Sequence, residues 1–437
     1  MERTYTSKLI DKIGQEILIK GWVHIIRDQS KIIFIILRDI KGTIQCVVSI
    51  DNEVIFKKAR NLKDECVIEI KGVVKTEKQA PGGIEILISE INLLSKPTED
   101  IPIPVVEKSE HETEQSLRLD YRWIDLRKPD KALIFKAWTT MESAFRNFLI
   151  ENEFIEIHSP KLMSTPSESG SELFEVKYFE KTAYLAQSPQ FYKQMAMSSG
   201  LERVFEIGPI FRANPSFTSR HDTEFTGFDF EMSFIKSHQD IIELEEKLIS
   251  NIVREVKNAH GDEIRSKYSN ELIVPTIPFP QIKLIEAKKI LKDLNIESER
   301  DDDLSPLEER ELSKYVKIKH NHEFVFVTDY PVSIRPFYHM RKEDDINITK
   351  SFDLLWNGIE ITTGAQREHR YTTLLKQAKD KGLSIDPIKH YLDFFKYGCP
   401  PHGGCGIGPS RMIMTMFGLP NVREVTYVYR GVKRLTP

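Results

Sequence analysis

The sequence predicts an α+β protein in which a small β-barrel of five strands precedes a larger domain built from an antiparallel sheet flanked by helices. Residues 1–100 contain short β-branched runs between Gly, Asp and Asn turns. Beyond residue 132 the chain mixes strands with amphipathic helices, without the regular alternation that makes a parallel sheet. At 437 residues the chain is too long for one ordinary core, so we expect two or three domains.

Five apolar runs in the first hundred residues predict the strands of the barrel. They span residues 16–28, 31–39, 42–50, 65–75 and 84–94, and "EVIFKKARNLK" predicts a helix between the third and fourth. This order is typical of an OB-type barrel, a fold that commonly binds single-stranded nucleic acid on one face. A small β-domain without a ligand is the alternative that the strand count leaves open.

A change of composition separates this barrel from the rest. The segment "SKPTEDIPIPVVEKSEHETEQ" is rich in Pro and charge and lacks periodicity, which predicts a hinge. We therefore expect a barrel domain over 1–100, a hinge over 101–131 and a larger domain over 132–437. In the larger domain one helix face is predicted by apolar residues at three- and four-residue spacing: Ile134, Trp138, Met141, Phe145 and Phe148.

Later runs predict the elements of the large domain. A long amphipathic helix is expected over 238–259. Strands are expected over 154–162, 183–188, 203–211, 226–234, 322–331 and 352–364.

Bulk charge and hydropathy exclude some classes of function. A net charge of -4 argues against nucleic-acid binding through charge alone, although it permits local basic sites. No apolar run approaches the roughly 18 residues that span a bilayer, and the N-terminus lacks an apolar signal core. We therefore expect a cytoplasmic protein without a membrane partner.

The stretch "FRANPSFTSRHDTEF" concentrates Arg212, Arg220 and His221 between two apolar segments. Arginine forks match phosphate oxygens in a bidentate way, so such a loop could hold a triphosphate, with Phe225 as a flat surface for a base. A solvated charged hairpin is the alternative.

The stretch "HGGCGIGPSR" is a glycine-rich strand that enters an apolar helix, with Arg411 at the junction. Such a junction suits an anion or a nucleotide, although it is neither GxGxxG nor a P-loop. Packing is the other use of these glycines. The overlapping "CPPHGGC" could suggest a metal, but a fourth ligand is missing.

Two further stretches carry candidate polar groups. In "FDLLWNGIEITTGAQREHR", strand alternation places Glu360 and Thr362 on one face, and Glu360 suits a Mg²⁺ ion that bridges ATP phosphates. Arg367 could hold a carboxylate. In "AQSPQFYKQ", Gln187, Gln190 and Lys193 lie at a strand-to-helix junction, where Lys193 suits the carboxylate of a small substrate. Solvated surface charge is the alternative for both.

Taken together, these stretches resemble the three signature motifs of class II aminoacyl-tRNA synthetases. "FRNFLIENEFIEIHSP" resembles motif 1, "FRANPSFTSRHDTEF" motif 2 and "GCGIGPSRM" motif 3. With the barrel, the order is similar to subgroup b, which handles Asp, Asn and Lys. "TAYLAQSPQFYKQ", "EFTGFDFEMSF", "ITTGAQREHR" and "KRLTP" resemble the aspartyl-tRNA synthetases of archaea and eukaryotes, and the resemblance covers essentially the whole chain.

The resemblance implies an aspartate–tRNA ligase that uses ATP, L-aspartate and tRNA(Asp), with Mg²⁺ as cofactor and a homodimer formed through motif 1. It implies catalytic roles for Arg212, Glu360 and Arg411, and metal ligands at Glu360, Thr363 and Asp353. The ATP-binding residues that it implies are Arg212, Asn214, Arg220, His221, Asp222, Phe225, Glu360, Gly408 and Arg411.

For the amino acid, the resemblance implies contacts from Glu168, Gln190, Lys193, Arg212, Asp229, Thr363 and Arg367. Lys193 and Arg367 could both pair with the side-chain carboxylate of aspartate, whereas the amide of asparagine would leave buried cations unpaired. An unpaired buried charge costs about 3–5 kcal/mol, which favours aspartate.

In the barrel, Arg27, Phe34 and Gln45 match family positions that read the central anticodon base by stacking and hydrogen bonds. Enzymes of this type restricted to tRNA(Asp) tend to carry Trp at the position of His24 and Lys at that of Pro81. The residues of this chain therefore favour charging of tRNA(Asn) as well as tRNA(Asp).

The chain departs from the family pattern at Asn214, where an acid is frequent, and at Ser410, where Glu is usual. These changes suggest a divergent member. Three alternatives remain: an asparagine–tRNA ligase, a relative that makes asparagine from aspartyl-adenylate, and an RNA-binding or regulatory paralogue without catalysis.

Overall fold

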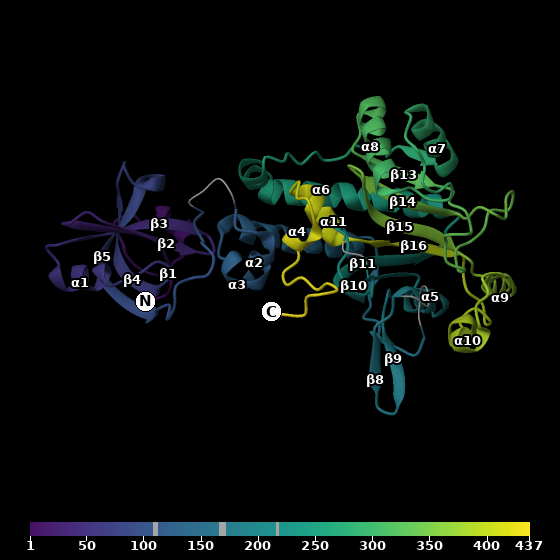
Figure 1. Ribbon diagram of the computed structural model, residues 1–437, viewed down its shortest axis with the longest axis horizontal. Helices are drawn as coiled ribbons and strands as arrows, with labels where there is room; N and C mark the ends of the chain where they lie inside the picture. Colours follow the sequence, from purple (N-terminus) through teal and green to yellow (C-terminus); the bar gives the residue numbers. More distant parts are fainter. Residues whose placement is uncertain (108–111, 166–171, 216–217) are drawn as a thin grey trace. The chain divides into compact units, whose positions relative to one another are not determined.

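The computed structural model describes residues 1–107, 112–165, 172–215 and 218–437, and it divides into two compact units (Figure 1). One unit is Met1–Ala132 and the other is Leu133–Thr436. The boundaries expected at residues 100 and 131 stay predictions.

The first unit contains a closed barrel of five strands in the order β1-β2-β3-β5-β4. The strands are β1 (Glu16–Asp28), β2 (Ile32–Asp39), β3 (Gly42–Ser49), β4 (Val67–Thr76) and β5 (Ile84–Ser95), with α1 (Glu53–Arg60) after β3. Ile33, Ile35 and Leu37 alternate along β2 and point into the core with no exposure. The predicted OB-type barrel is confirmed.

The second unit is organised around an eight-stranded sheet in the order β12-β13-β14-β15-β16-β11-β10-β6. Its central strands are antiparallel, as predicted, but the edge pairs β12/β13 and β6/β10 are parallel. The strands are β6 (Ile155–Glu156), β10 (Arg203–Phe211), β11 (Glu224–Ser233), β12 (Gln281–Lys283), β13 (Phe324–Thr328), β14 (Ser351–Trp356), β15 (Ile359–Arg367) and β16 (His402–Ile407).

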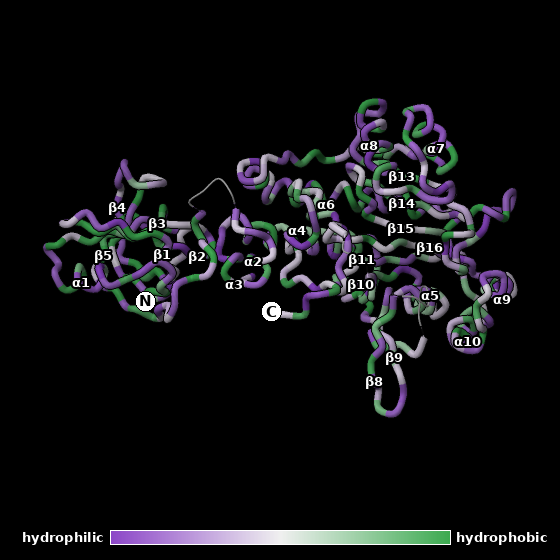
Figure 2. The backbone as a smooth tube through the Cα atoms, in the orientation of Figure 1, coloured by the Kyte–Doolittle hydropathy of each residue, from purple (hydrophilic) through white to green (hydrophobic). Residues whose placement is uncertain are grey.

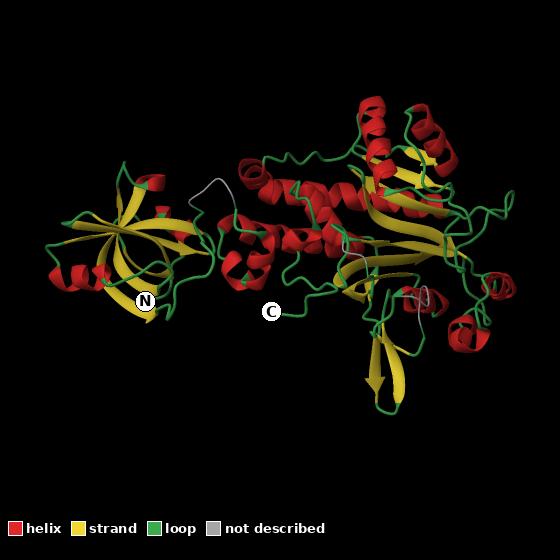
Figure 3. Ribbon diagram, in the orientation of Figure 1, coloured by secondary structure: helices red, strands yellow, loops and turns green. Residues whose placement is uncertain are grey.

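Three helices pack against this sheet and form its main core (Figure 3). They are α4 (Pro129–Glu151), α6 (His238–Tyr268) and α11 (Pro409–Met416). The predicted apolar face of α4 is buried there: Met141 and Phe145 have no exposure. This layer leaves the opposite face of the sheet for the site described below.

Smaller elements complete the chain. The remaining helices are α2 (Gln115–Asp120), α3 (Arg122–Asp125), α5 (Gln190–Ser198), α7 (Leu284–Asp293), α8 (Pro306–His320), α9 (Tyr371–Asp380) and α10 (Ile385–Asp393). A small sheet contains β7 (Leu162–Met163), β8 (Glu175–Tyr178) and β9 (Lys181–Leu185). The outer helices α8 and α9 are largely hydrophilic (Figure 2), and no helix of the described residues is long and apolar enough to cross a membrane.

Several predicted strands differ in extent from the observed ones, and two of the differences have a clear physical reason. The run 154–162 forms only Ile155–Glu156 as a strand before its Ser-Pro sequence ends the pairing, because proline cannot donate to a ladder. The run 352–364 forms the hairpin β14–β15 instead of one strand. Its turn is made by Asn357 and Gly358 at φ 48° and 81°, as a two-residue hairpin requires.

Glu245 of α6 is a fully buried acid in the core beneath the sheet. Burial raises its pKa to about 8, against a smaller opposing effect of the neighbouring Thr362 and Cys405 side chains. The folded state therefore keeps a proton on Glu245 that the unfolded state loses above a pKa of 4.5. This group makes the protein progressively less stable as the pH rises from about 4.5 to about 8.

Glu245→Gln should remove this penalty because the amide mimics the protonated acid. At about 1.4 kcal/mol per pKa unit, the gain at pH 9 is about 3–5 kcal/mol, which raises the Tm by about 5 °C or more, with little change at pH 5. Thermal unfolding at both pH values checks this. The exposed Glu243→Gln on the same helix is the control, and an equal Tm for wild type and Glu245→Gln at pH 9 contradicts the assignment.

Candidate functional site

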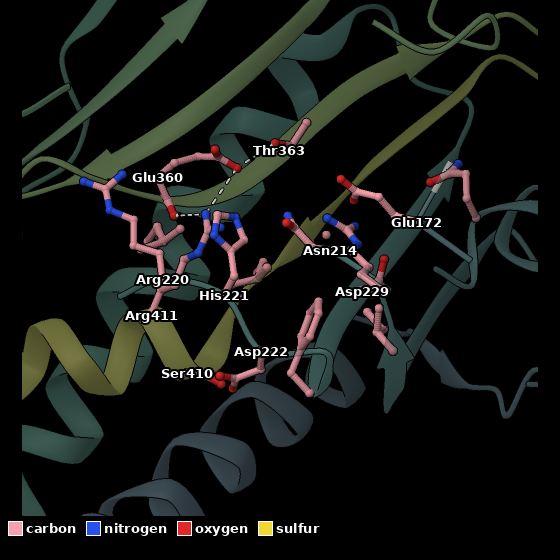
Figure 4. Close-up of a pocket in the computed structure, with 18 of the residues that line it drawn as sticks. Glu172, Asn214, Arg220, His221, Asp222, Asp229, Glu360, Thr363, Ser410 and Arg411 are labelled. Atoms are coloured by element: carbon pink, nitrogen blue, oxygen red, sulfur yellow. Dashed lines mark hydrogen bonds and ion pairs between the residues drawn. The ribbon is translucent and has the colours of Figure 1, made fainter. Parts of the chain in front are cut away.

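A cavity of about 360 Å³ opens on the face of the sheet that α4, α6 and α11 leave uncovered (Figure 4). Its walls come from the β10–β11 hairpin, from β15, from the junction of β16 with α11 and from the segment that precedes β14. All four candidate stretches of the sequence therefore contribute residues to one cavity.

The hairpin loop is held over the cavity by backbone pairing. Phe211 and Glu224 end the register of β10 with β11, and Arg212 N–H donates to the Thr223 carbonyl at 2.9 Å, which extends the pairing by one residue. The Arg212 guanidinium lies 5.8 Å from the centre of the Phe225 ring, and Asn214 lines the same wall.

Cations gather at one end of the cavity around Glu360. Arg411 Nη1 donates to the Glu360 carbonyl at 2.7 Å and lies 3.6 Å from its Oε1. Arg220 donates to the Gly358 carbonyl at 2.9 Å and pairs with Glu309 of α8. Burial, and then the Arg411 charge, lower the pKa of His221, so His221 is a neutral ring at this end. Such a cluster suits the oxygens of a polyphosphate.

A β-bulge decides which residues of β15 face the cavity. The register of β14 with β15 shifts between Leu354 and Leu355. Because a bulge adds one residue to a strand, Glu360 and Thr363 come to one side, and Thr363 Oγ1 donates to Glu360 Oε1 at 3.1 Å. The prediction that Glu360 and Thr362 share a face is therefore wrong: Thr362 is buried on the other side.

Glu360 and Thr363 offer a suitable donor set for Mg²⁺, which prefers oxygen ligands and keeps several waters or phosphate oxygens. Burial alone would raise the pKa of Glu360, but the charges of Arg411 and Arg335 outweigh burial and lower it, so this carboxylate is ionised. Asp353 differs. Asp353 is buried and does not line the cavity. It accepts a hydrogen bond from Arg335 at 2.6 Å, so its carboxylate is part of a salt bridge and not of the donor set around Glu360.

Asp222 and Ser410 lie side by side at the far edge of the cavity (Figure 4). Asp222 Oδ2 accepts from Thr426 Oγ1 at 3.0 Å, and burial raises its pKa to about 7. Asp222, which the resemblance implies as an ATP-binding residue, therefore lines the cavity while its carboxylate is paired with Thr426.

The glycines of β16 and of its junction with α11 differ in what lies next to them. A Cβ on Gly404 would lie 2.0 Å from the Phe230 carbonyl oxygen, and one on Gly403 would lie 2.7 Å from that of Ala365. These two are needed for close strand packing. Gly406 and Gly408 line the cavity, and Gly408 N–H donates to the Ile361 carbonyl at 2.8 Å where α11 begins.

The other end of the cavity is a buried ion-pair network. Lys193 Nζ lies 2.8 Å from Asp229 Oδ1 and 3.5 Å from Glu231 Oε2. Arg367 Nε donates to Glu231 Oε1 at 3.0 Å. Asp229, Arg367 and Gln190 line the cavity, whereas Lys193 is fully buried behind Asp229. The Gln190 amide nitrogen has no hydrogen-bond partner among the described residues.

This network is charged. Burial alone would lower the pKa of Lys193, but Asp229 and Glu231 outweigh it and raise the pKa. Burial alone would raise the pKa of Glu231, but Arg367 and Lys193 outweigh it and lower the pKa. Two cations and two carboxylates are therefore balanced before any ligand enters.

Several residues of the site were not predicted from the sequence. Period-two alternation in "FDFEM" puts Glu231 on the face of Asp229, so this residue could have been found. Glu309, Arg335 and His339 had no such signal, because they come from α8 and from an irregular segment distant in sequence. The predicted Glu168 lies outside the described residues. Glu172 lines the cavity and had not been predicted.

On the barrel, the three predicted anticodon residues lie on adjacent strands. Arg27 of β1 is the register partner of Phe34 in β2, and Gln45 of β3 pairs with Ile36 of β2. Phe34 and Gln45 are part-buried while their neighbours Ile33, Ile35 and Ile44 point into the core, so both side chains are on the outer face. Gln45 donates to Glu85 at 2.9 Å.

The two residues predicted to decide between tRNA(Asp) and tRNA(Asn) differ in their surroundings. His24 Nδ1 lies 2.6 Å from Arg38 Nη1, and Arg38 in turn makes a bidentate pair with Glu65. Burial, and then Arg38, lower the pKa of His24, so His24 is a neutral acceptor. Pro81 is exposed in the turn between β4 and β5.

Comparison with known proteins covers both units. Residues 114–429 match the family described as tRNA synthetases class II (D, K and N). Residues 17–94 match the family described as OB-fold nucleic acid binding domain.

Full-length relatives are similar to this chain in sequence and in structure. The aspartate–tRNA(Asp/Asn) ligase of Methanopyrus kandleri is 41% identical, and the aspartate–tRNA(Asp) ligase of Thermococcus kodakarensis is 40% identical, each over 100% of both chains. Among solved structures, an asparaginyl-tRNA synthetase from Pyrococcus horikoshii complexed with asparaginyl-adenylate superimposes with a TM-score of 0.93 at 32% identity, over 100% of both chains.

Proposed function

This chain belongs to the class II tRNA synthetases of the D, K and N group, and from that premise we propose that its cavity activates L-aspartate with ATP and passes the aspartyl group to tRNA. It is an aspartate–tRNA ligase, an enzyme class that uses ATP and typically Mg²⁺. The alternatives of a paralogue without catalysis and of a tRNA-independent relative are disfavoured by the full-length similarity and by the cations that line the cavity.

The observation that carries the choice of amino acid is the pairing of Lys193 with Asp229. Asp229 lines the cavity, so a substrate ammonium group that binds there shares this carboxylate with Lys193. Lys193 and Arg367 still share Glu231, and the network of these four described side chains gains a net positive charge. The side-chain carboxylate of aspartate cancels that charge and the amide of asparagine does not.

This argument also answers the asparagine alternative. The backbone similarity to an asparaginyl-tRNA synthetase shows that the two folds are nearly the same. Specificity then depends on side chains, and the buried cations Lys193 and Arg367 favour an anionic substrate.

In the first step, an α-carboxylate oxygen of aspartate attacks the α-phosphorus of ATP, and pyrophosphate leaves. Arg212, which lines the cavity, stabilises charge on the transferred phosphorus, while Arg220, His221 and Arg411 hold the outer phosphates. Glu360 and Thr363 are the residues that would hold Mg²⁺, which when bound neutralises phosphate charge. In the second step, a ribose hydroxyl of the terminal tRNA adenosine attacks the aspartyl carbonyl and AMP leaves.

The barrel supports the use of tRNA. Its outer face presents Phe34 for stacking and Gln45 and Arg27 for hydrogen bonds, a combination suited to splayed single-stranded bases. His24 and Pro81 favour acceptance of both tRNA(Asp) and tRNA(Asn). Charging of purified tRNA(Asp) and tRNA(Asn) transcripts with labelled aspartate tests this, with labelled asparagine as control. Aspartate on tRNA(Asp) alone contradicts the wider tRNA use but leaves the ligase activity intact.

Pro81→Lys should narrow this tRNA use. Lysine at the exposed turn adds a charge that discriminates between the two anticodons, so we expect the ratio of kcat/KM for tRNA(Asp) over tRNA(Asn) to rise about tenfold, as one good base contact allows. Aspartylation kinetics with both transcripts measure the ratio. Gln79→Lys, in the same exposed loop, is the matched control, and an unchanged ratio in Pro81→Lys contradicts the role of this turn.

We also propose that the enzyme is a homodimer in the cytosol. The motif 1 segment exposes Ile150 and Ile155 to 53% and 49%, and these apolar side chains are available to a second copy. A monomeric mass in light scattering at micromolar concentration contradicts it.

A further inference from the structure

His339 lies in the irregular segment between β13 and β14, and its backbone is held by contacts to β15 and to α9. It forms an isolated β-bridge with Arg367 of β15. The Gln377 amide of α9 donates to its carbonyl at 3.1 Å and to that of Phe337 at 2.6 Å. The His339 side chain is 3% exposed and lines the cavity.

One side-chain contact defines the state of the ring. His339 Nε2 lies 2.9 Å from Arg367 Nη1. A guanidinium group only donates, so Nε2 accepts, and the ring is neutral with its proton on Nδ1. Burial, and then the Arg367 and Arg335 charges, lower the pKa of His339 well below its ordinary value, in agreement with a neutral ring.

The partners of Arg367 explain why a neutral acceptor is needed there. Arg367 Nε and Nη2 donate to the Glu231 carboxylate, and Nη2 also donates to the Gly404 carbonyl at 3.0 Å. His339 Nε2 contacts Nη1. A second acid at this position would cancel the positive charge that the substrate carboxylate needs, and a cation would repel the guanidinium. A neutral imidazole holds the arginine and leaves its charge available.

We infer that His339 is a positioning residue for substrate specificity: its Nε2 holds the Arg367 guanidinium in the orientation that receives the side-chain carboxylate of aspartate. This inference rests on the proposed activation of aspartate. It adds a residue that touches Arg367 and acts through it.

Three substitutions separate positioning from packing. His339→Leu keeps about the same volume without an acceptor, His339→Gln can place an amide oxygen near the position of Nε2, and His339→Glu adds a negative charge beside Arg367. His322→Leu is the control for stability, because His322 is also buried, does not line the cavity, and has contacts to the Phe324 backbone and the Thr276 carbonyl. All are tested as full-length enzyme by ATP–pyrophosphate exchange with aspartate and with asparagine, and by thermal unfolding.

In His339→Leu we expect the KM for aspartate to rise about tenfold or more, since a hydrogen bond to a charged group is lost, with the KM for ATP unchanged. The preference for aspartate over asparagine should fall by a similar factor. His339→Gln should restore both values to within about threefold, as one retained hydrogen bond allows. His339→Glu should lose most of its preference, and His322→Leu should keep wild-type KM values at a lowered Tm.

The outcomes are distinguishable. If wild type activates aspartate but His339→Leu keeps its KM and preference, the positioning role is wrong and the proposed function stands. If His339→Leu and His322→Leu change KM together, the effect is structural and the role is also wrong. If wild type does not exchange pyrophosphate with aspartate, the proposed function itself fails.

Discussion

Arg212→Ala should reduce aspartate-dependent ATP–pyrophosphate exchange by about 10³-fold, because it removes the fork of donors that we propose stabilises charge on the transferred phosphorus. Arg212 leads from β10 into the loop and lines the cavity, 5.8 Å from the centre of the Phe225 ring. In the proposed first step its loss removes a partner of the group that is transferred. The effect should appear mainly in kcat, since charge develops on the phosphorus in the transition state.

Two variants control this result. Arg212→Lys keeps the charge without the planar fork and should recover only part of the rate. Arg265→Ala removes an arginine on α6 that is 61% exposed, and it should exchange pyrophosphate like wild type. Exchange within about threefold of wild type in Arg212→Ala, well short of the loss expected for a transition-state donor, contradicts the role of Arg212.

Glu360→Gln should lower the same exchange at least about 100-fold and raise the Mg²⁺ concentration needed for half-maximal rate. The amide keeps the size of the side chain and a partner for Thr363 Oγ1, but it loses the anionic oxygen. The low pKa of Glu360, which the charges of Arg411 and Arg335 maintain against burial, makes this anion available at neutral pH.

A magnesium titration of the exchange rate measures both parts of this effect. Glu323→Gln changes an acid that pairs with Lys317 at 2.9 Å near the edge of the same sheet and should behave like wild type. A Glu360→Gln enzyme with a normal rate and normal magnesium dependence contradicts the placement of the metal.

Much of the fold follows from patterns in the sequence. Alternation places Ile33, Ile35 and Leu37 inside the barrel, and three- and four-residue spacing buries Met141 and Phe145 of α4. These patterns depend on residues close together in the sequence, so they can be recognised without knowledge of the tertiary contacts. The cations of the site were also visible, because Arg212, Arg220 and Arg411 stand in stretches with few neutralising neighbours.

Other features depend on contacts between distant segments and left no local signal. The bulge that turns Thr363, and not Thr362, to the face of Glu360 arises from the pairing of β14 with β15. Lys193 was expected at the substrate but is fully buried behind Asp229, since Asp229 and Glu231 of β11 offset the cost of its burial. His339 reaches Arg367 only because a segment without regular structure lies against β15.

If the buried network of Lys193, Arg367, Asp229 and Glu231 selects aspartate, ATP–pyrophosphate exchange by the wild-type enzyme should distinguish aspartate from asparagine at equal concentrations. We expect fast exchange with aspartate and a kcat/KM for asparagine lower by at least about 100-fold, the equivalent of an unpaired buried charge. Equal exchange with both amino acids, or a preference for asparagine, would contradict this selection of aspartate.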